Sequence, residues 1–178
     1  YTRQMNMRGL GDAILKGETI IGDAPFGVVL AYDLCIGDDQ GVLAQMVGLF
    51  KQYRCSIVAI EEVPADQTRS YGIIDGEKIS DSLVRVTDMV EKPAPEDAPT
   101  NLAIIGRYIL TPDIFDILRN TEPGKNGEIQ ITDALLTQAR TGTVMAYKFR
   151  GRRFDCGSVG GFVAATNYYY EKAYDSRA

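Results

Sequence analysis

The stretch that decides the fold is 26–63, which reads FGVVLAYDL (26–34), DQGVLAQMVGLFKQYR (39–54) and CSIVAIEEV (55–63). The outer two segments are apolar runs that end in charge, which is typical of buried strands. The middle segment repeats apolar residues at i, i+3, i+4 and i+7, the spacing of one helical face, at Leu43, Met46, Val47 and Phe50. Strand, helix and strand in this order predict a βαβ unit with parallel strands and a right-handed crossover.

The segments on either side extend this α/β pattern. Further strands are predicted at YGIID (71–75), LVRVTDMVEK (83–92), AIIGRYIL (103–110) and TVMAYKF (143–149). Helices are predicted at 9–21, at 111–120, where Thr-Pro forms an N-cap and first helical position, at 127–142, and after a turn within 151–174. We therefore expect one α/β domain over residues 1–178, with a mixed, mostly parallel sheet between helices.

The composition excludes several classes of protein. Hydrophobic residues make up 45% and charged residues 24% of the chain, as in ordinary globular domains, and the net charge is −5. The Lys and Arg residues are scattered, so we expect neither a nucleic-acid nor a membrane partner. There is no signal-peptide pattern and no apolar run near the roughly 20 residues that span a bilayer. The three cysteines lack CxxC spacing, which favours a reducing, cytoplasmic compartment over disulfides or a zinc site.

The chain contains no histidine. Ser-His and Cys-His nucleophilic pairs and histidine-bound metals are therefore excluded. Any chemistry has to use carboxylates, lysine, arginine, backbone groups or an oxygen-bound ion.

Three acids follow predicted strands, namely Asp33, Glu91 and Asp155. Ligands of open α/β sheets collect at the carboxyl ends of strands, so together these acids indicate a site. Each acid taken alone is better explained as a solvated strand end or a helix cap. Carboxylates with a lysine nearby suit a magnesium–phosphate substrate, since Mg²⁺ prefers carboxylate, water and phosphate oxygens.

Four motifs resemble those of the bacterial UTP–glucose-1-phosphate uridylyltransferases, within the wider sugar-nucleotidyltransferase family. They are YGIIDG (71–76), MVEKPAPEDAPTNLAIIGRYIL (89–110), GKNGEIQITDAL (124–135) and YKFRGRRFDCGSVGGF (147–162). The resemblance covers essentially the whole chain. It implies the nucleotide-diphospho-sugar transferase (Rossmann-like) fold and transfer of a uridylyl group from UTP to glucose 1-phosphate, with Mg²⁺ as cofactor. It also implies a homo-oligomer, a dimer or tetramer, in which NYYYEKAY (167–174) either joins an interface or packs on its own sheet.

The resemblance assigns roles to matching residues. Gln4 and Gly9 match the segment that reads the uracil base. Gly72 matches a glycine whose backbone meets the sugar, although a glycine at a strand start reads equally well. Glu91 matches the carboxylate that accepts hydrogen bonds from glucose hydroxyls, and Lys92 the ammonium that meets phosphate. Since neighbouring residues of a strand point to opposite faces, this pair requires the strand to end or twist there, which Pro93 favours.

Further matches concern the metal and the phosphate groups. Asp155 matches the second metal-binding acid, so we predict Lys92 and Asp155 as catalytic and Asp33 and Asp155 as metal ligands. Glu128 fits an acid that complements a helix dipole better than a ligand contact. Four basic residues either meet phosphate or lie in a solvated turn, namely Lys148, Arg150, Arg152 and Arg153.

Two features depart from the family pattern. The glycine-rich GxGTR loop that cradles the triphosphate belongs before Tyr1, and it is absent from this chain, which alone should then be inactive. In LAYDL, Tyr32 occupies the position of the first metal-binding acid, and a neutral phenol is a poor Mg²⁺ ligand. Asp33 replaces it only if the strand end shifts. The alternatives are a sibling enzyme such as a thymidylyltransferase, or a non-catalytic relative with a degraded metal site.

Overall fold

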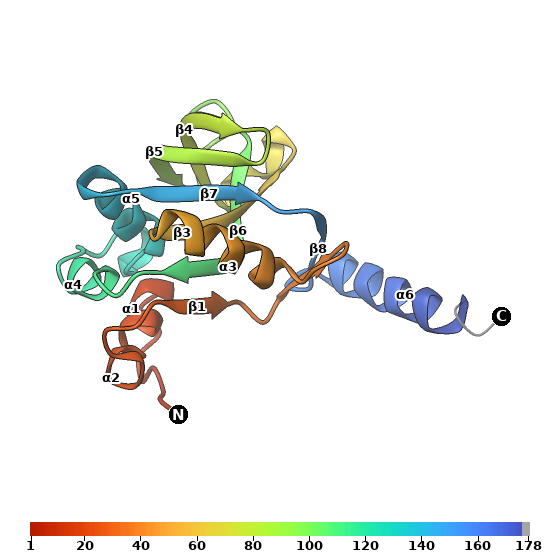
Figure 1. Cartoon of the computed structure of the whole chain (residues 1–178), viewed down its shortest axis with the longest axis horizontal. Coiled ribbons are helices and arrows are strands. Elements are labelled where there is room, and N and C mark those ends of the chain that lie inside the picture. The colour runs from red at the N-terminus through yellow and green to blue at the C-terminus, as the bar shows by residue number, and fades with distance from the viewer. Residues whose placement is uncertain (176–178) are drawn as a thin grey trace.

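The computed structural model describes residues 1–175 and is built on a six-stranded sheet (Figure 1). The strand order is β1-β6-β3-β7-β5-β4. These strands are β1 (Phe26–Val29), β3 (Ser56–Glu62), β4 (Gly72–Ser80), β5 (Leu83–Glu91), β6 (Leu102–Leu110) and β7 (Val144–Lys148). The predicted α/β class and mixed sheet are thus confirmed.

The share of parallel pairs is smaller than predicted. Among the described strands of this sheet, β3 and β7 alone pair in parallel, while β1–β6, β3–β6, β4–β6, β5–β7 and β4–β5 are antiparallel. The strands of the predicted βαβ unit, β1 and β3, do run in the same direction, because each is antiparallel to β6. The later strand β6 lies between them, an order that a local pattern of apolar residues does not specify.

The predicted strand at 26–34 is divided in two. Strand β1 ends at Val29, and β2 (Asp33–Gly37) pairs instead with β8 (Gly151–Asp155) in a second, two-stranded sheet. The turn between β1 and β2 is closed by the Asp33 amide, which donates to the Leu30 carbonyl at 3.2 Å. Strand β8 was predicted as a turn, because its glycine and two arginines give no apolar alternation.

Helices cover both faces of the main sheet. The described helices are α1 (Leu10–Leu15), α2 (Glu18–Ile21), α3 (Val42–Tyr53), α4 (Ile114–Arg119), α5 (Ile131–Thr141) and α6 (Val159–Asp175), with short 3₁₀ turns at Ala65–Ser70 and Lys125–Gly127. Of these, α6 lies away from the main sheet (Figure 1). Alternate residues of β3 enter two cores. Val58 and Ile60 pack in the core with α1, α4 and α5, whereas Ile57 and Ala59 pack in the core with α3.

The helical face of α3 is rotated from the predicted one. Val42 and Met46 are buried, whereas Val47 is 40% exposed, and Leu43 and Phe50 are partly buried at the edge of the core. The predicted helix at 127–142 begins later, at Ile131, after an extended Gln130. The residues before it form an irregular entry to the helix, and that entry lies against the candidate site.

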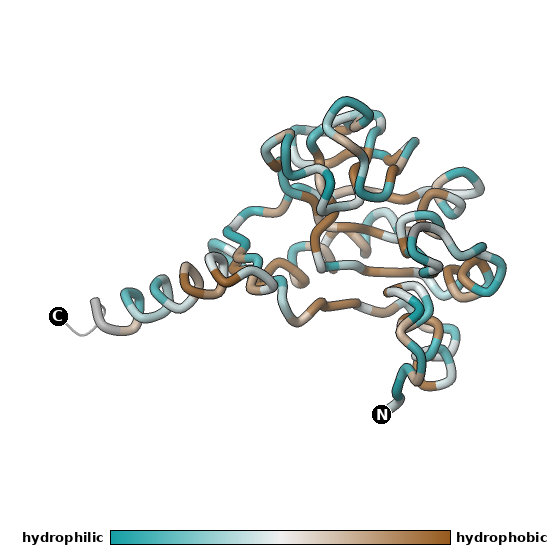
Figure 2. The backbone as a smooth tube through the Cα atoms, turned by 180° about the vertical axis from the view of Figure 1, so that it is seen from behind, coloured by the Kyte–Doolittle hydropathy of each residue, from teal (hydrophilic) through white to brown (hydrophobic). Residues whose placement is uncertain are grey.

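Helix α6 projects away from the sheets (Figure 1), and Figure 2 shows apolar turns near its start. Tyr168 packs on Phe154 of β8, with ring centroids 5.4 Å apart. Tyr169 and Tyr170 are exposed, as are Val159, Phe162 and Val163. The sequence left two interpretations of these tyrosines, an interface or packing on the protein's own sheet. The helix does not pack on the main sheet, and its contact is with β8. None of the helices described in residues 1–175 has the length and hydropathy needed to cross a membrane.

Candidate active site

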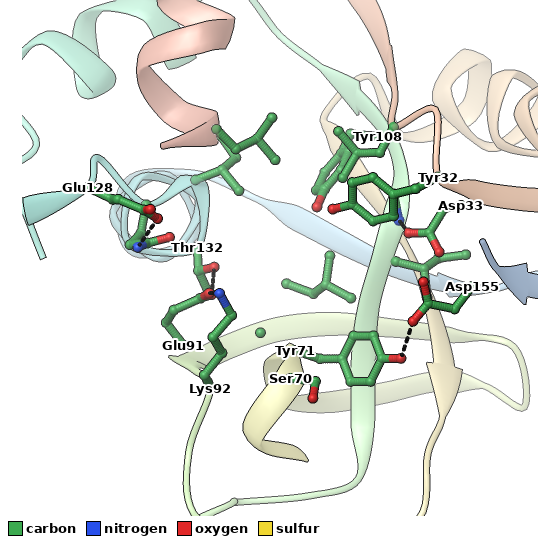
Figure 3. A pocket seen from close by; sticks show the side chains of 18 of the residues that line it. Tyr32, Asp33, Ser70, Tyr71, Glu91, Lys92, Tyr108, Glu128, Thr132 and Asp155 are labelled. Atoms are coloured by element: carbon green, nitrogen blue, oxygen red, sulfur yellow. Dashed lines mark hydrogen bonds and ion pairs between the residues drawn. The ribbon is translucent and has the colours of Figure 1, made fainter. Parts of the chain in front are cut away.

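A cleft of about 320 Å³ opens where several strands and one helix end or begin (Figure 3). Its wall combines the end of β5, the start of β4, the end of β8, the turn between β1 and β2, and the first turn of α5. The predicted residues that line it are Asp33, Gly72, Glu91, Lys92 and Asp155. Glu91 and Asp155, predicted to belong to one site, both line the cleft, and they come from different sheets whose ends meet there.

Glu91 is the last residue of β5 and is held from two directions. The hydroxyl of Thr132, in the first turn of α5, donates to its Oε2 at 2.5 Å. The Nζ of Lys92 lies 3.4 Å from its Oε1. The Glu91 side chain is only 16% exposed, so the carboxylate is partly desolvated and directed rather than free at a strand end.

Lys92 has a left-handed backbone, with φ of 48°. A residue with a Cβ rarely adopts this conformation, and here it is held by the Lys92 amide, which donates to the Tyr71 carbonyl at 2.9 Å. The left-handed turn breaks the alternation of the strand, so that both Glu91 and Lys92 line the same cleft. The predicted twist after Glu91 is therefore confirmed.

Gly72 pairs with Glu91 across β4 and β5. A Cβ at this position would lie 3.1 Å from Thr132 Oγ1 and 3.2 Å from Glu91 Oε2. The absence of a side chain keeps space beside the carboxylate for a ligand. Glycine is favoured here because Thr132 and Glu91 approach its Cα closely, and not because of an unusual φ angle.

Asp33 is buried in an ion pair and is not available to a ligand. Its Oδ1 is bonded by the Arg153 guanidinium, and its Oδ2 accepts the Gly106 amide at 2.7 Å. The side chain is 4% exposed, and that of Arg153 is 6% exposed. Burial alone would lower the pKa of Arg153, but the hydroxyl of Tyr71 and the charge of Asp33 outweigh burial and hold that pKa above its ordinary value.

Asp155 pairs directly with Asp33 across β2 and β8, and it faces the cleft. Its Oδ1 accepts the Gly157 amide at 3.0 Å, and the hydroxyl of Tyr71 donates to its Oδ2 at 3.5 Å. Its side chain is 37% exposed. Both oxygens therefore keep lone pairs for a further ligand.

Tyr32 and Tyr108 bring two phenols to the same wall (Figure 3). Tyr32 is half exposed, and burial followed by the charges of Asp33 and Asp155 raises its pKa above the ordinary value. Burial also raises the pKa of Tyr108. Both side chains remain neutral near pH 7, so Tyr32 brings no negative charge to this position.

The chain is similar to known proteins over almost its whole length. A family model described as nucleotidyl transferase matches residues 1–172. The chain belongs to the nucleotidyl transferase family. The UTP–glucose-1-phosphate uridylyltransferase of Pseudomonas aeruginosa is 64% identical over 175 residues, which cover 98% of this chain and 63% of that protein. The enzyme of the same name from Streptococcus pneumoniae is 44% identical over 95% of this chain and 58% of its own.

Solved structures agree with the family assignment. A crystal structure of UDP-glucose pyrophosphorylase complexed with UDP-glucose superposes with a TM-score of 0.94 at 59% identity, covering 97% of this chain and 66% of that one. A UTP-bound enzyme from Acinetobacter baumannii gives a TM-score of 0.83 at 33% identity, covering 94% of this chain and 58% of that one. The nucleotidyltransferase fold predicted from the motifs is thus confirmed, and the chain spans less than two thirds of these relatives.

The cleft offers few ligands for a metal ion. Within the described residues, no group of three or more acids or cysteines is placed to hold a metal ion. The prediction that Asp33 is a ligand does not fit, because both of its oxygens are already bonded. Asp155 does fit, since Mg²⁺ bound with substrate phosphates and water needs only one or two carboxylates.

The two residues predicted to read the base lie outside the cleft wall. The amide of Gln4 donates to Asp12 Oδ2 at 2.7 Å and to the Gly9 carbonyl at 3.1 Å. Gly9 has φ of 90°, and a Cβ there would approach Glu128 Cβ within 2.8 Å. These residues pack the N-terminal segment against the entry to α5, next to the cleft residue Leu10.

Glu128 lines the cleft rather than capping a helix, because α5 begins three residues later. Of the four predicted basic residues, Arg153 alone lines the cleft. Lys148 pairs with Glu62 at 2.7 Å, and Arg152 lies over the rings of Phe154 and Tyr168.

The sequence did not reveal the roles of Tyr71 and Thr132. Each bonds a predicted acid from a distant part of the chain, 84 residues away for Tyr71 and 41 for Thr132. Tyr71 adjoins the predicted Gly72, and Thr132 lies inside the EIQITDA motif. The one feature of the sequence that could have indicated Tyr71 and Thr132 is that both lie within the motifs.

Proposed function

We propose that this chain carries the sugar-phosphate side of a UTP–glucose-1-phosphate uridylyltransferase. In this reaction the phosphate of glucose 1-phosphate attacks the α-phosphorus of UTP, giving UDP-glucose and pyrophosphate. The observation that carries the proposal is the cleft in which Gly72, Glu91, Lys92 and Asp155 meet. The similarity to a protein solved with UDP-glucose supports it.

Glu91 is the residue proposed to read the sugar. Its Oε2 is held by Thr132, while the Nζ of Lys92 lies 3.4 Å from Oε1. A carboxylate accepts hydrogen bonds from sugar hydroxyls, and such charge-assisted bonds are stronger than neutral ones. The space beside Gly72 admits the sugar ring against the backbone.

Lys92 is proposed to neutralise phosphate. Its side chain is 41% exposed and directed to the cleft by the left-handed turn. Transfer of a nucleotidyl group depends on positioning and charge neutralisation rather than on a protein nucleophile, so a chain without histidine suffices.

Asp155 is the residue proposed to hold Mg²⁺. When bound, a divalent ion supplies charge stabilisation to the transferring phosphate oxygens. Asp155 is oriented for this role by the amide of Gly157 and the hydroxyl of Tyr71. Gln4 and Gly9 are proposed to contact the base, from the segment that adjoins Leu10 at the rim of the cleft.

Two features favour a second function. Tyr32 occupies the place of an acid, and Asp33 is engaged by Arg153. A non-catalytic relative that binds a nucleotide sugar without turnover would tolerate both. We also propose that the chain is cytoplasmic, in line with its three free cysteines, and that it forms a homo-oligomer in which the exposed face of α6 takes part.

The test uses a chimaera in which this chain replaces the matching segment of the Pseudomonas relative. UDP-glucose and pyrophosphate should form from UTP and glucose 1-phosphate in the presence of Mg²⁺. Glu91→Gln should weaken use of glucose 1-phosphate by roughly ten-fold or more, and use of UTP much less, because an amide lacks the charge-assisted bond. Binding of UDP-glucose without product would favour the non-catalytic relative. Equal loss for both substrates would contradict a sugar-reading Glu91.

A further inference from the structure

The hydroxyl of Thr132 makes an unusual bond for a threonine in a helix. The other threonines of α5 donate to backbone carbonyls four residues back, Thr137 to Asp133 at 3.0 Å and Thr141 to Thr137 at 3.2 Å. Thr132 instead donates across the cleft to Glu91 Oε2 on β5 (Figure 3). A hydroxyl has one proton to donate, so this bond commits the hydroxyl to the carboxylate.

The surroundings of Thr132 make this bond hard to replace. Thr132 is 3% exposed, so water does not readily replace it as a partner of Oε2. Its methyl group and hydroxyl also lie against the Cα of Gly72, where a Cβ would come within 3.2 and 3.1 Å of them. Threonine therefore shapes the wall beside Gly72 and directs the carboxylate at the same time.

Without this bond, Glu91 would have a competing partner. Lys92 Nζ lies 3.4 Å from Oε1, and both side chains sit at a strand end with Lys92 41% exposed. An ion pair between them draws the carboxylate toward the lysine. The Thr132 hydroxyl opposes this from the side of the helix and keeps the two charges directed at separate groups.

From this geometry we propose that Thr132 is a positioning residue, which holds Glu91 for sugar hydroxyls and keeps Lys92 available for phosphate. This inference rests on the proposed function. The inference adds to the proposed function that the orientation of the Glu91 carboxylate depends on the first turn of α5 and not on β5 alone.

The test compares Thr132→Val, which keeps the shape and removes the hydroxyl, with Thr132→Ser, which keeps the hydroxyl. Thr137→Val in the same helix is the matched control. Binding of glucose 1-phosphate and of UDP is measured by calorimetry on the 178-residue chain, with the midpoint of thermal unfolding for each variant. Thr132→Val should weaken glucose 1-phosphate binding roughly ten-fold and UDP binding less than about two-fold. Thr132→Ser and Thr137→Val should bind like the unmodified chain.

If Thr132 had a merely structural role, Thr132→Val would change the affinities for glucose 1-phosphate and UDP to the same extent, or change neither. Either result would overturn the inference. Ligand-free crystal structures of the two Thr132 variants decide the matter independently of binding. In Thr132→Val, Glu91 should turn toward Lys92, whereas in Thr132→Ser it should remain against α5. A carboxylate that stays in place in Thr132→Val would refute positioning. If the unmodified chain bound no glucose 1-phosphate, the proposed function would fail, and the crystal structures would still test Thr132.

Discussion

Single residues decide which charges reach the cleft. Glu91 and Lys92 are adjacent in the chain, and the left-handed backbone of Lys92 allows both to line one wall. Asp33 and Asp155 are paired across β2 and β8, yet only Asp155 is open to a ligand. Arg153 contributes to that difference, because its guanidinium bonds Asp33 directly but lies 3.9 Å from Asp155 Oδ2.

Tyr32→Asp should restore a metal-binding pair. The side chain at position 32 lines the cleft close enough to Asp155 for that charge to raise the pKa of the phenol. A second carboxylate there should increase the affinity of the chain for Mn²⁺, a probe for Mg²⁺, by roughly ten-fold or more, measured by titration.

Two control variants show whether the change in Mn²⁺ affinity is specific to position 32. Tyr169→Asp on exposed α6 adds the same charge away from the cleft and should leave Mn²⁺ affinity unchanged. Asp33→Asn should lower stability rather than metal affinity. If Asp33→Asn abolished Mn²⁺ binding in a fully folded chain, Asp33 would be the ligand after all.

The sequence predicted which motif residues line the cleft, but it did not predict which residues bond to them. Gly72, Glu91, Lys92 and Asp155 lie at strand ends, where the order of apolar and charged residues marks them. The contacts that tune them join positions far apart, as in Arg153 with Asp33 and Thr132 with Glu91. Such pairs depend on how the two sheets meet, which no local pattern records.

At the scale of elements, the two-stranded sheet of β2 and β8 is the feature that places Asp155. It is joined to the main sheet by Arg107, whose Nη2 donates to the Asp33 carbonyl at 2.5 Å, and by the Gly106 amide. The sequence predicted neither the division of β1 from β2 nor the existence of β8. Apolar residues continue through the turn at Leu30 and Ala31, while β8 is too polar to be recognised.

Arg153→Met should destabilise this sheet strongly. It removes one partner of a buried pair and leaves the Asp33 carboxylate without its cation, a change that costs about 3–5 kcal/mol in other proteins. Urea unfolding at pH 7 provides the measurement. Arg152→Met is the control, since Arg152 is exposed, lies over the rings of Phe154 and Tyr168, and pairs with no buried carboxylate in the described residues; its loss should cost less than about 1 kcal/mol. Equal losses for the two variants would contradict the assigned role of Arg153.

Helix α1 provides a prediction that depends on pH. The amide of Gln4, assisted by Lys16, lowers the pKa of Asp12 below 3.8. A carboxyl group whose pKa is lower in the folded state contributes stability above the unfolded pKa, and that contribution is lost as the pH falls through the folded value. Asp12→Asn should therefore cost about 1 kcal/mol at pH 7 and progressively less below pH 4. A difference from the unmodified chain that does not depend on pH would show that the charge is irrelevant.

At the scale of the whole molecule, the chain arranges two sheets around one cleft and extends α6 beyond them (Figure 1). The class of fold was predictable, because helical and strand periods alternate clearly along the chain. The strand order was not, because β6 inserts between β1 and β3 from 40 residues or more away in sequence. The residues assigned to the sugar and phosphate depend on that order and on how the two sheets meet, since β5 and β8 belong to different sheets whose ends line one cleft.

The most direct test of this account is a crystal structure of the 178-residue chain with UDP-glucose and Mg²⁺. The glucosyl group should lie beside Gly72, with a sugar hydroxyl about 3 Å from Glu91 Oε1. Thr132 should still bond Oε2, and the diphosphate should face Lys92 and Asp155. A glucosyl group bound away from Glu91, or a diphosphate outside the cleft, would contradict the assignment of this site.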